Sequence, residues 1–159
     1  MNGMTRECIV TSIKAWLEKM KWQYNFDSNK STFKMGVYIG GALSKVRVVI
    51  PVRNDSYLVY VVSYIGCAEN KQNAIWFLTM ANYGLINGNF EVDVRDGEIR
   101  YKTYVNCIGM ETLPEQVISD SVMCACRTFR KYSSGIVQLC LNKENATPES
   151  EIKRCEGNV

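Results

Sequence analysis

The chain of 159 residues contains no histidine. Ser-His-Asp triads, Cys-His pairs and His-metal sites all depend on an imidazole to move a proton or to bind the metal, so these arrangements are excluded together. The Ser, Lys, Asp and Glu side chains that remain form no recognised catalytic pattern. The sequence therefore predicts a protein that is not an enzyme, and it assigns no catalytic, metal-binding, cofactor-binding or partner-binding residue.

Long hydrophobic runs are also missing. No apolar stretch reaches the roughly 18 residues that a membrane-spanning helix needs, and residues 1–7 lack the apolar centre of a secretory signal peptide. The net charge is only +3, and like charges never form a block of five along the chain. These features predict a cytoplasmic protein without a membrane partner, and they argue against a nucleic-acid partner.

The seven cysteines follow no regular spacing and include no Cys-x-x-Cys pair. Because their number is odd, at least one thiol must stay free, and a zinc site would call for paired cysteines or nearby histidines. Alternate residues on a helix point apart, so Cys124 and Cys126 are not expected to form a bridge. We interpret the cysteines as small buried hydrophobic residues in a reducing compartment, without disulfides or metal. They are Cys8, Cys67, Cys107, Cys124, Cys126, Cys140 and Cys155.

Hydrophobic periodicity predicts an α+β fold in which an antiparallel sheet packs against helices. The predicted order is helix, four strands, helix, two strands, helix. Residues 57–65 are apolar on both faces, which indicates the central strand. The predicted helices cover about residues 6–21, 70–87 and 114–141, and the strands lie around 22–26, 33–39, 46–52, 57–65, 90–94 and 99–103.

The strand pair between the last two helices is the most distinct local signal. Apolar residues alternate at Phe90, Val92 and Val94 and resume at Ile99, and Asp96-Gly97 supplies the positive backbone angles of a tight turn. The pattern predicts a hairpin with one buried face. The last helix begins near Pro114, and Gly135 either ends it or leaves a weak point within one long helix.

Length and composition are typical of one globular domain, which we place at residues 5–142. Residues 143–159 are polar, contain Pro148 and carry few large apolar groups. We therefore expect a flexible C-terminal tail.

Neighbouring carboxylates and clustered glycines call for separate interpretation. Glu91 with Asp93, and Asp96 with Glu98, occupy strand or turn positions where alternation sends them to solvent, so we expect a solvated surface rather than acid-base chemistry. The glycines at 36, 40 and 41 are followed by no Gly-Lys-Ser/Thr and begin no helix, which favours a turn over a phosphate loop.

Three motifs together resemble a known family. They are an Asn-x(n)-Gly-x-Phe pattern within residues 81–93, Asp-Gly-x-Ile-x-Tyr at 96–101 and Pro-Glu at 114–115. The pattern looks like the YbjN-type bacterial sensory transduction regulator family, whose members are similar in fold to type III secretion chaperones. The resemblance covers most of residues 5–142. It implies a secretion-chaperone-like fold with a regulatory or chaperone-like role, and it carries over no catalytic residues.

The strand-rich region also gathers aromatic residues, on a sheet of which one face packs on helices. The second face meets solvent, a partner or a second copy. Proteins that stack single-stranded nucleic acid on aromatic rings also need interleaved basic residues, and Lys34, Lys45 and Arg47 meet this requirement only in part. The leading hypothesis is a non-enzymatic protein-interaction module that acts as a homodimer. The alternative is a regulator that binds a small ligand between sheet and helices without turnover. The aromatic residues are Trp22, Tyr24, Tyr38, Tyr57, Tyr60 and Tyr64.

Overall fold

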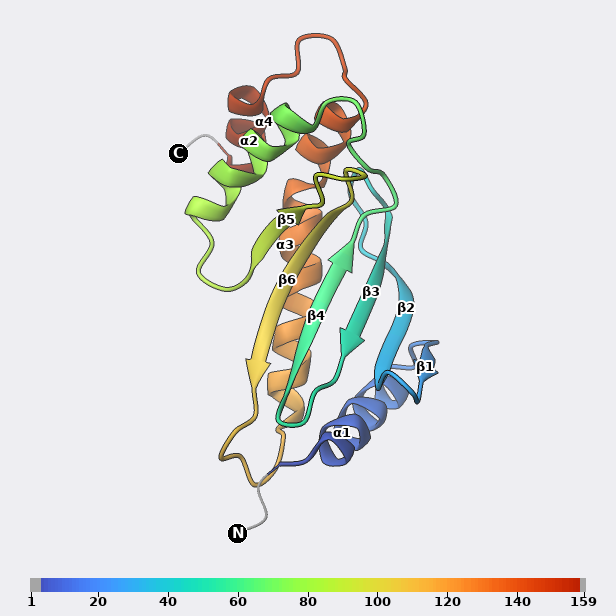
Figure 1. The fold of residues 1–159 in the computed structure, drawn as a ribbon. Coiled ribbons are helices and arrows are strands. Elements are labelled where there is room, and N and C mark those ends of the chain that lie inside the picture. Colours follow the sequence, from blue (N-terminus) through green and yellow to red (C-terminus); the bar gives the residue numbers. More distant parts are fainter. Residues whose placement is uncertain (1–3, 158–159) are drawn as a thin grey trace.

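The chain folds in the order that the periodicity predicts, with one further helix at its end (Figure 1). The computed structural model describes residues 4–157. The helices are α1 (Arg6–Lys19), α2 (Lys71–Tyr83), α3 (Glu115–Cys140) and α4 (Pro148–Glu156). The strands are β1 (Asn25–Asp27), β2 (Thr32–Tyr38), β3 (Lys45–Pro51), β4 (Ser56–Val62), β5 (Asn89–Val92) and β6 (Ile99–Asn106).

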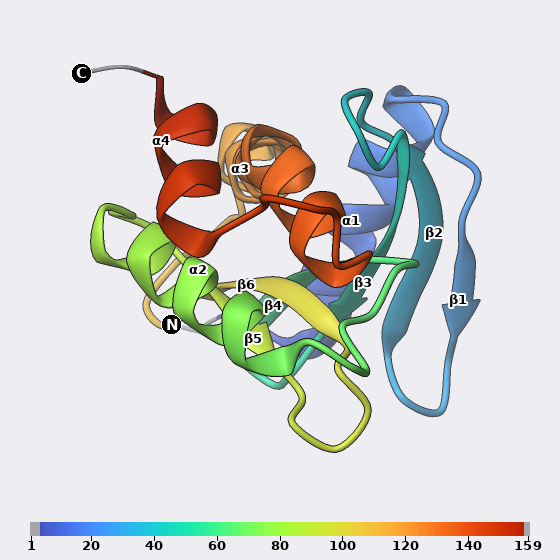
Figure 2. The same cartoon turned by 90° about the horizontal axis from the view of Figure 1, so that it is seen from above.

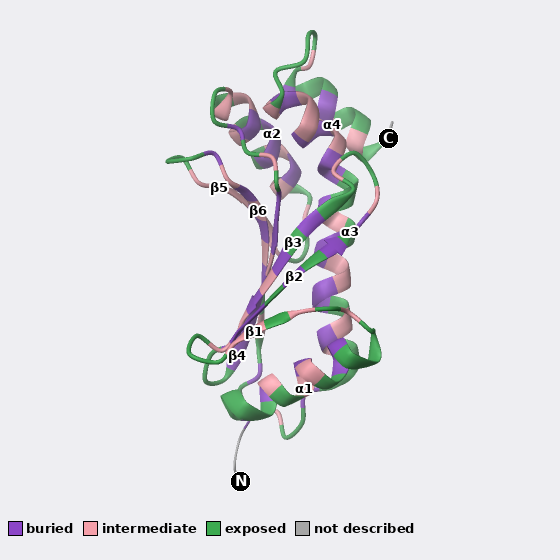
Figure 3. Ribbon diagram, turned by 90° about the vertical axis from the view of Figure 1, so that its right-hand side faces the viewer, coloured by how far each residue is buried: buried purple, intermediate pink, exposed green. Residues whose placement is uncertain are grey.

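All six strands belong to one antiparallel sheet in the spatial order β1-β2-β3-β4-β6-β5. The predicted central strand is confirmed, because β4 pairs with β3 on one side and with β6 on the other. Figure 3 shows α1 and α3 on one side of this sheet. Seen from above (Figure 2), α3 lies between α1 and the pair formed by α2 and α4. One face of the sheet is therefore turned away from the helices.

The helix α3 runs without a break from Glu115 to Cys140 and passes through Gly135. A Cβ atom added to Gly135 would overlap the ring of Phe77 on α2, with Cε2 only 2.7 Å away. The glycine is thus explained by close packing between α2 and α3 rather than by the end of a helix. The predicted apolar stripe of α3 is buried as expected, at Ile118, Val122, Ala125, Phe129 and Tyr132.

An aromatic cluster joins the hairpin of β5 and β6 to α3. The ring of Phe90 lies 5.1 Å from Tyr101, 5.6 Å from Phe129 and 5.5 Å from Tyr132, measured between centroids. All four side chains are buried. Aromatic pairs at such distances add to the free energy that burial of their area already supplies.

The hairpin is shorter than predicted at one end. Its first strand stops at Val92, and Val94 is 65% exposed instead of facing the core. The side chain of Asp93 accepts a hydrogen bond from the backbone N–H of Arg95, which turns the chain before Val94 can continue the strand.

The expectation of a flexible tail is wrong for residues 148–156, which form α4. Thr147 caps this helix in a reciprocal pair of hydrogen bonds with Ser150. Trp76 Nε1 on α2 donates to Glu149 at 2.9 Å, and the Tyr132 hydroxyl on α3 donates to Glu156 at 2.9 Å. An N-terminal cap and polar contacts therefore stabilise α4, although the segment has too few apolar residues for the sequence to predict a helix there.

The expectation of a chain without disulfides is also wrong. Cys67, in the loop after β4, is bonded to Cys140 at the end of α3, although 73 positions separate them in the chain. Within residues 4–157 the other five cysteines are free, including Cys124 and Cys126, for which no bridge was expected. The pairing follows from the packing of two distant elements, which spacing along the chain cannot reveal.

Candidate functional site

The sheet face that is turned away from α1 and α3 is named here the outer face. Side chains alternate between the two faces of a strand, so the residues between the buried core positions belong to it. The pairing registers align Arg47, Val62 and Arg100 in one row across β3, β4 and β6, and Val49, Tyr60 and Lys102 in the next. The outer face comprises Lys34, Gly36, Tyr38, Lys45, Arg47, Val49, Leu58, Tyr60, Val62, Arg100, Lys102 and Tyr104.

The centre of the outer face is apolar. Leu58 and Val62 are only 8% and 4% exposed, although strand alternation places them on the face turned away from α1 and α3. Between them, Tyr60 is half-buried, and the guanidinium of Arg100 lies 4.5 Å from the centre of its ring. Long cationic side chains thus cover an apolar strip with their stems and aromatic contacts. The prediction that this strand is apolar on both faces is confirmed.

Tyrosines border this strip and project into solvent. Tyr38 is 79% exposed, Tyr64 is 59% exposed and Tyr104 is 54% exposed. Lys45 and Tyr64 lie close over Gly36, because an added Cβ there would come within 2.7 Å of the lysine Cε and 3.7 Å of the tyrosine hydroxyl. Tyrosine is among the side chains that are enriched at protein interfaces.

The structure separates the aromatic residues that the sequence groups together. Tyr57 is fully buried on the helix-covered face, where its hydroxyl lies 3.0 Å from Ser121 Oγ on α3. Trp22 and Tyr24 pack against the core. Only Tyr38, Tyr60 and Tyr64 of that group belong to, or border, the outer face. Tyr104 joins them from β6, a residue that sequence reasoning did not select.

Charge on the outer face is only partly compensated. Glu91 bonds to Arg100 at 2.7 Å and to Lys102, and Glu98 bonds to Arg47 at 3.1 Å. Lys34 and Lys45 take part in no ion pair within residues 4–157. The outer face is therefore positive overall around its apolar centre.

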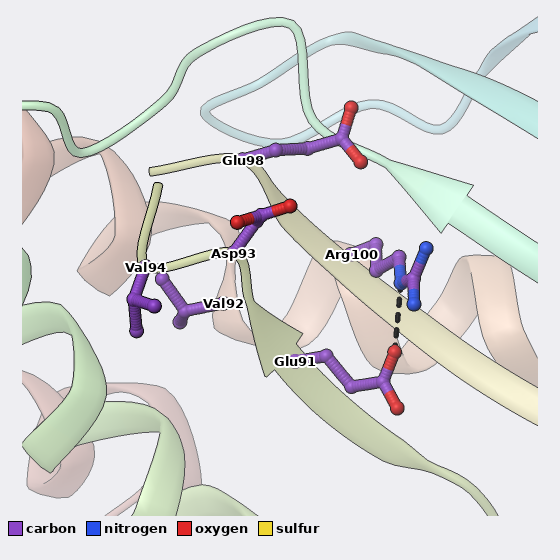
Figure 4. Close-up of a pocket in the computed structure, with 6 residues that line it drawn as sticks. All are labelled: Glu91, Val92, Asp93, Val94, Glu98 and Arg100. Atoms are coloured by element: carbon purple, nitrogen blue, oxygen red, sulfur yellow. Dashed lines mark hydrogen bonds and ion pairs between the residues drawn. The ribbon is translucent and has the colours of Figure 1, made fainter. Parts of the chain in front are cut away.

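A cavity of about 510 Å³ opens at the end of β5 and β6 (Figure 4). It gathers three carboxylates, from Glu91, Asp93 and Glu98, and could therefore suggest acid-base chemistry. The side chain of Arg95 donates to Asp93 and holds the pKa of that carboxyl well below its usual range. The remaining residues that line the cavity are Val92, Val94 and Arg100.

Glu91 in the same cavity also stays ionised. Partial burial raises the pKa of its carboxyl, but hydrogen bonds from Lys102 and Arg100 outweigh this effect and leave the pKa below its usual value. A general acid at neutral pH needs a raised pKa, so Glu91 and Asp93 match an ion-paired surface better than a catalytic pair. Within residues 4–157, no group of three His, Cys, Asp or Glu side chains is arranged to hold a metal ion.

The edge of the sheet at β5 is closed by a side chain. Asn82 on α2 accepts a hydrogen bond from the N–H of Phe90 at 2.7 Å and donates to the carbonyl of the same residue at 3.0 Å. Its amide takes the place of a neighbouring strand and satisfies both backbone groups. Asn82 and Phe90, both within residues 81–93 of the first sequence motif, therefore have a structural role at this edge.

Comparison with known proteins identifies the fold. No family model matches the chain, and no curated protein matches it. A chain of the solved HopA1-SchA chaperone-effector complex is similar, with a TM-score of 0.55 at 11% identity over 79% of this chain and 92% of that one. YbjN from E. coli is similar with a TM-score of 0.53 at 9% identity, over 79% and 91% of the two chains. The chain shares the fold of these proteins.

The likeness confirms the resemblance that the three motifs carry, and it agrees with the α+β fold class predicted from hydrophobic periodicity. At 9% and 11% identity it concerns the fold alone. As for membranes, none of the helices in residues 4–157 has the length and apolar character needed to cross one.

Proposed function

We propose that the chain is a non-enzymatic binding module, chaperone-like or regulatory, that holds a protein partner against its outer face. The observation that carries the proposal is the group of exposed tyrosines, Tyr38, Tyr64 and Tyr104, around the half-buried Tyr60 on the outer face. Exposed tyrosines of this kind are suited to desolvation by a second protein surface. One of the similar chains comes from a chaperone-effector complex, which supports a protein partner.

Charge complementarity suggests the chemistry of the partner. The outer face carries five cations, Lys34, Lys45, Arg47, Arg100 and Lys102, and Glu91 and Glu98 compensate only part of them. An acidic polypeptide segment with apolar side chains would pair with Lys34 and Lys45 at the border and cover Tyr60 at the centre. Its association rate should fall as the salt concentration rises.

The test uses truncation of two exposed tyrosines, Tyr38→Ala with Tyr64→Ala, against Tyr83→Ala as the matched control. Tyr83 is 96% exposed and lies on α2, away from the outer face. The tagged unmodified chain and the tagged variants capture partners from native lysate, and mass spectrometry identifies the captured proteins. The affinity of each variant for the captured protein is then measured. Loss of two aromatic contacts should weaken binding by about tenfold or more, whereas the control should bind like the unmodified chain. Equal binding by all three proteins would contradict the proposed surface.

The proposal includes a homodimer, which the resemblance to the regulator family favours. Sedimentation or light scattering should then give twice the monomer mass of 18.1 kDa. The tyrosine variants are measured alongside, so that loss of self-association can be distinguished from loss of the partner. A monomer mass at micromolar concentrations would overturn this part of the proposal and leave the binding surface untouched.

The alternative function, a small ligand held between sheet and helices, remains a prediction. Large buried side chains occupy that layer, among them Tyr57, Phe90, Tyr101 and Phe129. A thermal-shift screen would detect such a ligand, which at a hundredfold excess over its dissociation constant should stabilise the fold by about 2.7 kcal/mol.

A further inference from the structure

A second concave surface lies where the turn between β2 and β3 meets α3. The backbone N–H of Ala42 donates to Ser133 Oγ at 3.3 Å, and that hydroxyl donates to the carbonyl of Arg130 at 2.7 Å. These contacts leave a cavity of about 440 Å³, which we name the basic groove. It is lined by Gly41, Ala42, Arg127, Arg130, Lys131, Ser133 and Ser134.

The charges in the basic groove are uncompensated. No acidic side chain lines it, and Arg127, Arg130 and Lys131 take part in no ion pair within the described chain. The arginines of the outer face differ, since Arg47 and Arg100 each bond to a carboxylate. Residues at positions i, i+3 and i+4 share one helix face, so the three cations repel one another. A bound anion would relieve this repulsion.

Glycine allows the turn to pack closely against Ser133 and Arg130. The backbone at Gly40 and Gly41 has φ of 70° and 75°, and a Cβ at Gly40 would lie 3.5 Å from the Arg130 guanidinium carbon. A Cβ at Gly41 would come within 3.0 Å of Ser133 Oγ. The N–H of Gly41, an exposed residue, donates to no backbone acceptor among residues 4–157. A backbone donor on a turn that lines the groove is therefore open to solvent or to a ligand.

We infer that the basic groove binds a phosphate or pyrophosphate group carried by a small molecule. Guanidinium groups match phosphate oxygens with paired hydrogen bonds, and Lys131 supplies a further positive charge. The cavity volume lies within the range of about 300–1,000 Å³ that is usual for small-ligand sites. Nucleic acid would require a longer cationic track and exposed aromatic rings for stacking, and the groove is lined by neither.

Calorimetric titration with inorganic pyrophosphate at low ionic strength tests the inference. The full chain should bind the probe, and Arg127→Gln with Arg130→Gln should bind at least about tenfold more weakly, since charged hydrogen bonds are lost. Lys131→Gln is a second variant with no packing role against Gly40. The matched control, Lys30→Gln with Arg53→Gln, removes two exposed cations that form no ion pair within the described chain and belong to neither the basic groove nor the outer face, and it should change affinity by less than about twofold. Absence of pyrophosphate binding, or equal binding by all variants, would overturn the inference.

Two further arms distinguish the source of the phosphate. Competition of ADP with pyrophosphate for the groove supports a soluble small molecule as the source of the phosphate. Binding to vesicles that contain phosphatidylglycerol, without displacement by pyrophosphate, contradicts it. The groove and the outer face are tested by different variants, so failure of one proposal leaves the other standing.

Discussion

Replacement of both Cys67 and Cys140 by alanine is expected to lower the free energy of unfolding by about 4 kcal/mol. The bond closes a loop of 73 positions, and such a loop loses much of its conformational freedom in the unfolded chain once it is closed. Denaturation in urea measures the difference. For a chain of this size, the midpoint of thermal unfolding should fall by roughly 10 °C.

The exposed Cys8 supplies the control, because it is free and lies on α1. Cys8→Ser should leave the stability within about 0.5 kcal/mol of the unmodified chain. A reducing agent should destabilise the unmodified chain and the control, and it should leave the double alanine variant unchanged. If reduction has no effect on the unmodified chain, the Cys67–Cys140 bond does not form in solution.

The disulfide also bears on the predicted compartment. Placement in the cytoplasm remains a prediction, and one of its premises was that all cysteines are reduced. Disulfides are rare where glutathione and thioredoxin keep thiols reduced, so the Cys67–Cys140 bond stands against that premise. Alkylation of free thiols in intact cells, followed by mass spectrometry of these two cysteines, would show which state the cell maintains.

The hairpin could be predicted from the sequence because adjacent residues specify it, through the alternation of apolar residues and the Asp96-Gly97 turn. Gly97 adopts φ of 80° as the Asp-Gly pair requires, and a Cβ there would come within 2.6 Å of the Cys67 carbonyl. Val94 is exposed although it continues the alternation, because alternation alone does not determine where a strand ends. The strand ends here because the side chain of the neighbouring Asp93 accepts a hydrogen bond from the backbone N–H of Arg95 in the turn.

The candidate sites depend on contacts that are distant in sequence. Arg47, Val62 and Arg100 lie in one row only because of the register between β3, β4 and β6, which no single strand specifies. The basic groove likewise joins Gly41 to Arg130, almost ninety positions later. Sequence reasoning could identify the cations and the glycines individually, but not their assembly.

Truncation of Phe90 to alanine is expected to lower the free energy of unfolding by about 3–5 kcal/mol, as is usual for a large aromatic residue in a core. Its ring is 3% exposed and contacts Tyr101, Phe129 and Tyr132. The truncation opens a cavity between the hairpin and α3, and it removes three aromatic contacts at once. Urea denaturation followed by circular dichroism gives the difference.

Val94→Ala is the matched control, four residues further along the same hairpin. The side chain of Val94 is 65% exposed, so its truncation should change the free energy of unfolding by less than about 0.5 kcal/mol. The sequence pattern alone placed both residues on one buried face and would predict losses of similar kind. A large loss of unfolding free energy for Val94→Ala would mean that Val94 is buried and that the first strand extends beyond Val92. A small loss for Phe90→Ala would mean that the hairpin does not pack on α3 through this ring. Because Phe90 also lies in the first sequence motif, the pair of variants tests whether that motif specifies the packing of the fold.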